Sequence, residues 1–201
     1  TWEYLSDYNT HSTGPSDSDD EEMTVLNRVL RWTSEGLEYE ADPRQCERLL
    51  EGLGLDDSCN GAATPGIKAL PAQIGVEEKL PSSKQTEFRR LAARTNYVSA
   101  DRVDLQYSSK EACRFMSNPG TLAQAALKRL GRYVLNHKRL VYKYPWQEAT
   151  HVDVYCDTDW ACCPRTRKST SGGAIMIGAH TTRTYSATQT TVSLSSGEAE
   201  Y

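Results

Sequence analysis

Three segments in the second half of the chain place apolar residues at the spacing of a helix. They run over 84–99, 103–116 and 121–137, and each keeps its apolar side chains on one face. The positions that share these faces are Phe88, Leu91, Ala92 and Val98, then Leu105, Ala112, Phe115 and Met116, then Leu122, Ala126, Leu130 and Val134. The pattern predicts a layer of amphipathic helices with polar outer faces.

A different period marks the first third of the chain. Apolar and polar residues alternate over Thr24–Ala41 around the turn sequence "SEG", which predicts a β-hairpin. Asp42 and Pro43 then suit the N-cap and the first position of a helix, leucines follow at helical spacing, and Gly54 suits its end. The stretch from 56 to 83 is rich in Pro and Gly and is interpreted as a connecting segment.

Alternation returns near the C-terminal end. The segments 151–157, 172–178 and 181–188 predict three strands of an antiparallel sheet, and Ser195 or Ser196 can cap a short helix after them. The expected class is therefore α/β of the α+β kind: a hairpin, a small helical region and a three-stranded sheet with a helix start.

Charge is distributed unevenly along the 201 residues. The net charge is −4, yet residues 1–23 contain no Lys or Arg and several acids, and we expect this acidic segment to be disordered. Residues 84–143 instead carry thirteen Lys or Arg against four Asp or Glu. This basic excess favours nucleic-acid binding, with Arg89, Arg90, Arg129 and Arg132 as candidates, although solvated helix faces explain it equally well.

The six cysteines do not form a metal-binding or disulfide pattern. None are spaced as CxxC, and we interpret them as free thiols. No apolar run approaches the ~20 residues of a membrane span, and no signal peptide is visible, so we expect an intracellular protein, cytoplasmic or nuclear, without membrane contact.

Two carboxylate groups occur where a metal site could form. Asp157 ends the first of the three predicted strands, and Glu200 lies in the predicted helix start. A strand-end carboxylate beside one from a packed helix can bind Mg²⁺, which prefers oxygen ligands and supports phosphodiester hydrolysis. The alternative is that Asp157 and Asp159 are turn residues and that Glu198 and Glu200 favour a helix N-terminus.

The residue identities in the surrounding motifs are more specific than the spacing of the carboxylates. "YCDTDWACCPRTRKSTSGG" and "YSATQTTVSLSSGEAEY" resemble the ribonuclease H domain of copia-type (Ty1/copia-like) retrotransposon Pol polyproteins. "ARTNYVSADRVDLQYSSKEACRFMSNP" and "ALKRLGRYVL" resemble the connection that precedes this domain, where Tyr-x-x-x-x-Arg-x-Asp and Lys-Arg-x-x-Arg-Tyr recur. The segment from "LNRVLRW" to "LLEGLGL" is similar to the end of the reverse transcriptase region.

The resemblance implies a domain organisation and a set of site residues. It divides the chain into the acidic segment 1–23, the end of reverse transcriptase at 24–83, a helical connection at 84–147 and the N-terminal part of ribonuclease H at 148–201. Asp157 and Glu200 match catalytic carboxylates that bind Mg²⁺, with Mn²⁺ as an alternative. Arg165, Arg167 and Lys168 lie in the loop after the first strand, where they can meet the phosphates of an RNA–DNA hybrid.

The family pattern is matched only in part. The remaining catalytic aspartates and two further strands of the family are not matched, so we expect a truncated ribonuclease H-like unit with a cut first helix, inactive by itself and acting with the remainder of the Pol polyprotein. The first strand would be an exposed apolar edge. The alternatives are a non-catalytic nucleic-acid-binding module and a decayed copy of the element.

Overall fold

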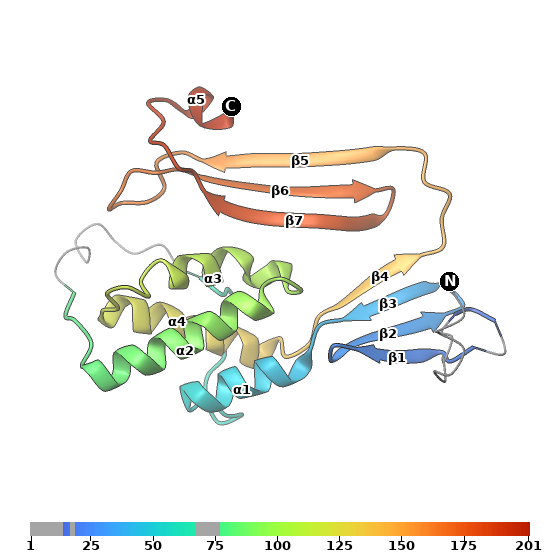
Figure 1. Ribbon diagram of the computed structural model, residues 1–201, viewed down its shortest axis with the longest axis horizontal. Coiled ribbons are helices and arrows are strands. Elements are labelled where there is room, and N and C mark those ends of the chain that lie inside the picture. The colour runs from blue at the N-terminus through green and yellow to red at the C-terminus, as the bar shows by residue number, and fades with distance from the viewer. Residues whose placement is uncertain (1–13, 17–18, 67–76) are drawn as a thin grey trace, which may run out of the picture.

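The computed structural model describes residues 14–16, 19–66 and 77–201. They form a cluster of helices flanked by two antiparallel sheets, one of four strands and one of three (Figure 1). The expected mixed class with antiparallel sheets is confirmed. Within the described residues, no helix has both the length and the apolar character needed to cross a bilayer.

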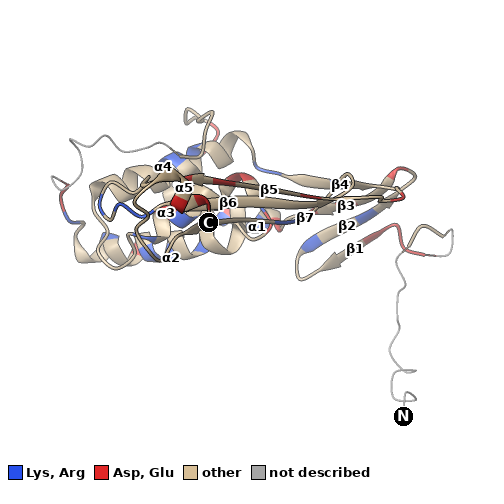
Figure 2. Cartoon of the chain, turned by 90° about the horizontal axis from the view of Figure 1, so that it is seen from above, with Lys and Arg blue, Asp and Glu red and all other residues tan. Residues whose placement is uncertain are grey.

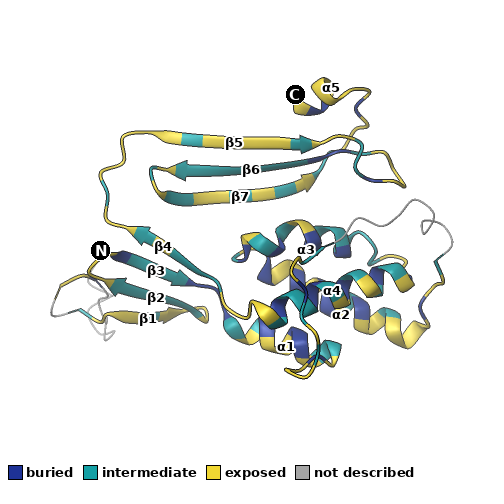
Figure 3. Cartoon of the chain, turned by 180° about the vertical axis from the view of Figure 1, so that it is seen from behind, coloured by how far each residue is buried: buried dark blue, intermediate teal, exposed yellow. Residues whose placement is uncertain are grey.

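Helices α1 (Pro43–Leu53), α2 (Ser82–Val98), α3 (Gln106–Cys113) and α4 (Thr121–Asn136) enclose the main hydrophobic core, with a 3-10 turn, η3 (Val103–Leu105), ahead of α3. Figure 3 shows buried residues concentrated in this cluster. Fully burying one Leu or Phe contributes about 1.5–3 kcal/mol, so this cluster holds most of the apolar stabilisation. The fully buried aliphatic side chains at its centre are Leu49, Leu105, Leu127, Leu130 and Val134.

The predicted face of α4 is wrong over its first two turns. Ala123 and Leu127 are buried, whereas Leu122 and Ala126 are only partly covered. Both pairs have helical spacing, one residue apart, so periodicity alone did not separate them. The neighbours decide it, because α1 and α3 pack on the side that carries Ala123 and Leu127.

The predicted first helix is confirmed down to its caps. The Asp42 carboxylate accepts a hydrogen bond from the Arg44 backbone N–H at 3.0 Å, which satisfies one of the free donors at the helix start. Pro43 occupies the first turn, and Gly54 ends α1 in the left-handed conformation at φ 61° and ψ 40°. Glycine adopts that conformation without the steric cost that a side chain would add.

The predicted hairpin is present but its first strand is divided. Leu26 and Asn27 adopt positive φ and form a turn between β1 (Glu22–Val25) and β2 (Arg28–Thr33), and β2 then pairs with β3 (Gly36–Glu40). A fourth strand, β4 (Val141–Pro145), pairs with β3 from more than 100 residues later. Glu22 and Met23 fall in the acidic segment predicted to be disordered but belong to β1, and residues 14–16 and 19–21 form bends and a bridge ahead of it. The part of that prediction over 1–13 and 17–18 lies outside the described residues.

The predicted three-stranded sheet is confirmed, with order β5 (Val152–Asp159), β6 (Thr170–Ile177) and β7 (His180–Thr188). Helix α5 (Ser196–Glu200) follows and packs near β5. Strand β5 is an edge, and Val152 and Val154 on it are 60% and 67% exposed, as the prediction of an apolar edge requires. Most of β5 is accordingly exposed (Figure 3).

Helix α3 and the residue that follows it connect the helical cluster to this sheet. Residues 106, 110 and 114 recur every four positions, so they lie on one side of the helix. Each donates a hydrogen bond to the sheet or its loop: Gln106 to Thr184 Oγ1 at 2.9 Å, Lys110 to Thr170 Oγ1 at 2.8 Å and Arg114 to Cys163 Sγ at 2.7 Å. The sheet is thus held against the helices by polar contacts.

Arg102 is the largest fully buried side chain, with 1% of its surface exposed. Its guanidinium donates to both carboxylate oxygens of Asp104 at 2.9 and 2.7 Å and to the His137 carbonyl at 2.9 Å, and it reaches the Lys138 carbonyl and Cys46 Sγ. The contact therefore joins α1, the turn before α3 and the end of α4. These two side chains are the Arg and Asp of the motif Tyr-x-x-x-x-Arg-x-Asp.

Replacing Arg102 should greatly lower the stability of the fold. Arg102→Met removes the charge, leaves Asp104 and two carbonyl groups without their donor, and should lower the free energy of unfolding by about 3 kcal/mol. Arg48→Met removes a guanidinium group from the exposed side of α1 and should change the free energy of unfolding by less than about 0.5 kcal/mol. Chemical denaturation of both variants makes the comparison; equal effects would contradict the structural role of Arg102.

Glu40 should make the protein sensitive to acid. It is 3% exposed and accepts hydrogen bonds from Arg139 and Arg31, which lower the pKa of its carboxyl from 4.5 to about 2 despite the opposing effect of burial. The ionised form is favoured in the folded state, so its contribution is complete above pH 4.5 and is lost as the pH falls toward 2.

Measuring the free energy of unfolding between pH 4.5 and pH 2 tests the contribution of Glu40. As the pH falls, the parent protein should lose stability more steeply than the Glu40→Gln variant, which has no carboxyl to protonate at this position. Glu47→Gln, at an exposed position of α1, should follow the parent curve. Parallel curves for the parent and Glu40→Gln would show that Glu40 does not couple protons to folding.

Candidate active site at the end of strand β5

Asp157 and Glu200, the two predicted catalytic carboxylates, line one cavity of about 520 Å³. Asp157 lies near the C-terminal end of β5 opposite Gly172 of β6, and Glu200 is the last residue of α5. Both side chains are exposed to solvent. The fold therefore brings together two residues that are 43 positions apart in the sequence.

Gln189 fixes α5 against the sheet. Its side-chain N–H donates to the Ala199 carbonyl at 2.6 Å and to Ser171 Oγ at 3.0 Å, and its oxygen accepts from the Ser193 hydroxyl at 3.1 Å. One amide thus ties the helix, strand β6 and the connecting loop together. Gln189 has no assigned chemistry in the sequence, and the structure makes it a positioning residue for Glu200.

The start of α5 is capped from both directions. Ser195 Oγ accepts a hydrogen bond from the Glu198 backbone N–H at 3.1 Å, and the Glu198 carboxylate accepts one from the Leu194 N–H at 2.7 Å. The prediction that Ser195 caps this helix is confirmed. Glu198 also lines the cavity, but its carboxylate serves the helix start, in agreement with its interpretation as a helix-end residue.

The donor set at this cavity is suited to a hard cation but small. Asp157 and Glu200 offer carboxylate oxygens of the kind that Mg²⁺ and Mn²⁺ prefer. Across the described residues, no cluster of three or more histidine, cysteine or carboxylate side chains is arranged to hold a metal ion. These two carboxylates fit as part of a metal site, and further ligands would have to come from elsewhere.

The loop between β5 and β6 is organised by the residues of the Arg-x-Ser-Thr-Ser motif. Ser169 is fully buried and its Oγ accepts from the Ala161 N–H at 3.0 Å, which supports the positive φ of Ala161. Thr170 Oγ1 accepts a hydrogen bond from the Lys110 ammonium, and Ser171 Oγ accepts one from the Gln189 side-chain amide. In the structure, these hydroxyls stabilise the turn and its contacts with α3 and Gln189.

Trp160 is partly exposed, although the size of a tryptophan side chain favours packing in the core. It is 42% exposed, and its indole N–H donates to the Ser193 carbonyl at 3.0 Å. This hydrogen bond braces the end of β5 against the loop before α5.

The three cations of this loop differ in their surroundings. Arg165 forms an ion pair with Glu77 and lies over the Phe115 ring at 4.7 Å. Arg167 is exposed in a turn with φ 59°, and Lys168 is half-buried; neither side chain has an ion-pair partner in the part of the chain that the structure describes. Only Arg167 and Lys168 are therefore free to meet phosphate without losing an internal charge contact.

The predicted basic residues of the helices have mainly internal partners. Arg89 donates to the Met116 carbonyl at 2.7 Å, and Arg129 donates to Thr64 at 2.8 Å. Arg132 donates to the Asn60 and Gly61 carbonyls, so it holds the loop after α1. Arg90 is exposed, without an ion-pair partner among the described residues. Figure 2 shows Lys and Arg distributed over α2, α3 and α4.

Two cations near the sheet were missed by the sequence analysis. Lys110 and Arg114 reach β6 and its loop from α3, and both also pair with Glu111. Burial raises the pKa of the Cys163 thiol, but hydrogen bonds from Thr166 and Arg114 lower it by more, so the pKa lies below its ordinary value. The four-residue spacing of 106, 110 and 114 was the available signal.

The chain is similar to known plant proteins. It is 30% identical over 161 residues to an uncharacterized mitochondrial protein, AtMg00810, of Arabidopsis thaliana, which covers 79% of this chain and 64% of that protein. It is also similar to the retrovirus-related Pol polyproteins from transposons RE1 and RE2 of the same plant, at 32% and 30% identity over 58% and 69% of this chain. The chain spans only 8% and 9% of those two polyproteins.

Comparisons with protein-family profiles and with solved structures identify no further relatives. No family profile matches the sequence, and no solved structure matches it. The relatives are retrotransposon Pol polyproteins and a protein of unassigned activity, and the chain is similar to a segment of each.

Replacing Gln189 should loosen α5 without unfolding the helices. Gln189→Ala removes the hydrogen bonds to Ala199, Ser171 and Ser193, and should increase amide exchange in α5 by about tenfold, equivalent to about 1.4 kcal/mol. Gln124→Ala on α4 is the matched control, because its amide has no hydrogen-bond partner among the described residues. Unchanged exchange in α5 would contradict the positioning role of Gln189.

Proposed function

We propose that this chain is a segment of a copia-type retrotransposon Pol polyprotein, in which residues 148–201 are the N-terminal part of a ribonuclease H. Residues 24–83 would be the end of the reverse transcriptase and 84–147 the connection between them. The substrate would be the RNA strand of an RNA–DNA hybrid. The observation that carries the proposal is that Asp157 on β5 and Glu200 on α5 line a single cavity.

The arrangement of β5, β6, β7 and α5 supports this assignment. Asp157 near the end of the edge strand β5 and Glu200 on the helix that packs beside it are both exposed and line the same cavity. Asp157 and Glu200 would hold a Mg²⁺ or Mn²⁺ ion. Such an ion, when bound, activates a water molecule and stabilises the leaving oxygen in phosphodiester hydrolysis.

Residues of this chain hold the two carboxylates in position. Gln189 positions the helix that carries Glu200, Ser195 and Glu198 cap that helix, and Trp160 braces the end of β5. The cavity is open to solvent and lies beside the edge strand β5. The ligands that complete a metal site would belong to the remainder of the polyprotein, which makes that remainder a partner of this segment.

The alternative of a non-catalytic binding module is less favoured by the geometry. Arg89, Arg129 and Arg132 are the residues on which it depends, and their guanidinium groups are hydrogen-bonded to the chain itself. Neutralising them would therefore disturb the fold as well as any nucleic-acid contact.

Cleavage of a labelled RNA–DNA hybrid in Mg²⁺ tests the proposal. The assay uses this chain and a longer version that continues past Tyr201 through the remaining carboxylates implied by the resemblance. The longer chain should cut the RNA strand, and Asp157→Asn should lower its rate by about 100-fold or more, since a metal ligand is lost. The control is Asp153→Asn, on the same strand but outside the cavity. A folded longer chain that cuts nothing, or that cuts equally well with Asp157→Asn, would refute the proposal.

A further inference from the structure

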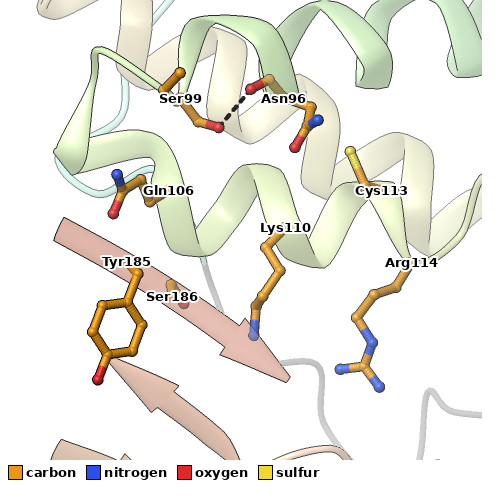
Figure 4. Close-up of a pocket in the computed structure, with 9 residues that line it drawn as sticks. Asn96, Ser99, Gln106, Lys110, Cys113, Arg114, Tyr185 and Ser186 are labelled. Atoms are coloured by element: carbon orange, nitrogen blue, oxygen red, sulfur yellow. Dashed lines mark hydrogen bonds between the residues drawn. The ribbon is translucent and has the colours of Figure 1, made fainter. Parts of the chain in front are cut away.

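A second cavity lies between helices α2 and α3 and strand β7. Its volume is about 600 Å³ and it is open to solvent. Figure 4 shows Lys110 and Arg114 extending from α3 toward the sheet, with Asn96 of α2 above and Tyr185 and Ser186 of β7 on the opposite side. None of these residues belongs to the predicted metal or nucleic-acid site.

The charge of this cavity is positive. Lys110 and Arg114 are four residues apart on one side of the helix, and no Asp or Glu is among the residues that line the cavity. Glu111 pairs with both cations, at 2.9 and 3.2 Å, so the three side chains together retain one positive charge. Both cations are partly enclosed, which weakens the screening of their charge by salt.

The walls also offer hydrogen-bond donors. The side-chain amide of Asn96 and the hydroxyl of Ser186 have no hydrogen-bond partner among the residues that the structure describes. The Tyr185 ring lies over Gly173, its partner on β6, and so on the face of the sheet opposite Thr184, which contacts α3 through Gln106. A cationic wall with free hydrogen-bond donors is suited to the phosphates of a nucleic-acid strand.

Ser186 connects this cavity to Asp157. Ser186 and Gln106 line both this cavity and a neighbouring one of about 650 Å³, whose lining also includes Thr170 and Asp157. A polymer that lies along this face of the sheet would therefore extend from the cationic cavity to Asp157.

We infer that the cavity formed by Asn96, Lys110, Arg114, Tyr185 and Ser186 binds the phosphodiester backbone of a nucleic-acid strand and guides it toward Asp157. The choice of ligand rests on the proposed function, whereas the site itself rests on the charge and donors described above. Phosphate oxygens would accept from the Asn96 amide and the Ser186 hydroxyl, and would be attracted by the charge of Lys110 and Arg114, whose own hydrogen bonds go to the sheet and its loop.

A charge introduced on the cavity wall tests the inference with little risk to the fold. Asn96→Asp places a carboxylate at an exposed position and leaves the α3–sheet contacts intact. It should weaken binding of a labelled oligonucleotide about fivefold at low salt, and the difference should shrink as salt is raised. The matched control, Asn118→Asp, adds the same charge at an exposed loop position outside the cavity and should bind as the parent does.

Lys110→Gln and Lys110→Arg form a second comparison. Loss of the charge should weaken binding and lower the slope of log affinity against log salt by about 0.7–0.9, whereas arginine should preserve both. Binding of single-stranded RNA, single-stranded DNA and the hybrid is measured separately. The nucleic acid whose affinity falls most in Asn96→Asp is the one that the cavity binds. Equal binding by Asn96→Asp and Asn118→Asp, or no binding by the parent chain, would overturn the inference.

Binding is measured without a divalent metal, so that it is independent of cleavage. If binding depends on Asn96 and Lys110 while the longer chain cuts nothing, the proposed function fails and this site stands. If the longer chain cuts the hybrid and binding ignores both substitutions, the proposed function stands and this site is wrong.

Discussion

The buried guanidinium of Arg102 is the contact on which the arrangement of the helices depends. A buried charge is costly unless it is paired and hydrogen-bonded, so Asp104 and the carbonyl groups at the end of α4 must be in place for the core to close. The same side chain reaches Cys46 of α1. Strand β4 begins shortly after these carbonyls and α3 shortly after Asp104, so the contact also sets where each sheet is attached.

The two sheets are joined to this centre differently. Strand β4 is covalently continuous with α4 through a short segment and completes the first sheet beside β3, where Trp146 stacks on Trp32 at 5.7 Å. The second sheet is held by the polar side chains of α3 and by Tyr144, whose hydroxyl donates to the Thr181 carbonyl. Because few apolar groups are shared, the position of the β5–β7 sheet depends on a small number of directed hydrogen bonds.

Local signals in the sequence were sufficient for most elements and insufficient for their assembly. The caps of α1, the three strands at the C-terminal end and the capping by Ser195 follow from residue chemistry within a few positions. The pairing of β4 with β3, the buried face of α4 and the exposure of Trp160 depend on residues far away in the chain, which periodicity does not contain. Likewise, the motif sequences suggested Asp157 and Glu200 as site residues, whereas the contacts of Gln189, Lys110 and Arg114 depend on how the sheet packs against α5 and α3.

The central proposal is that Asp157 and Glu200 belong to one metal-binding site. Electron paramagnetic resonance of Mn²⁺ bound to the longer chain tests it most directly, since it measures the metal rather than the reaction. The account predicts that Glu200→Gln and Asp157→Asn each weaken Mn²⁺ binding by about 10-fold or more, while Glu198→Gln, whose carboxylate caps α5, leaves it nearly unchanged. Equal losses from Glu198→Gln and Glu200→Gln, or none from either Glu200→Gln or Asp157→Asn, would contradict it.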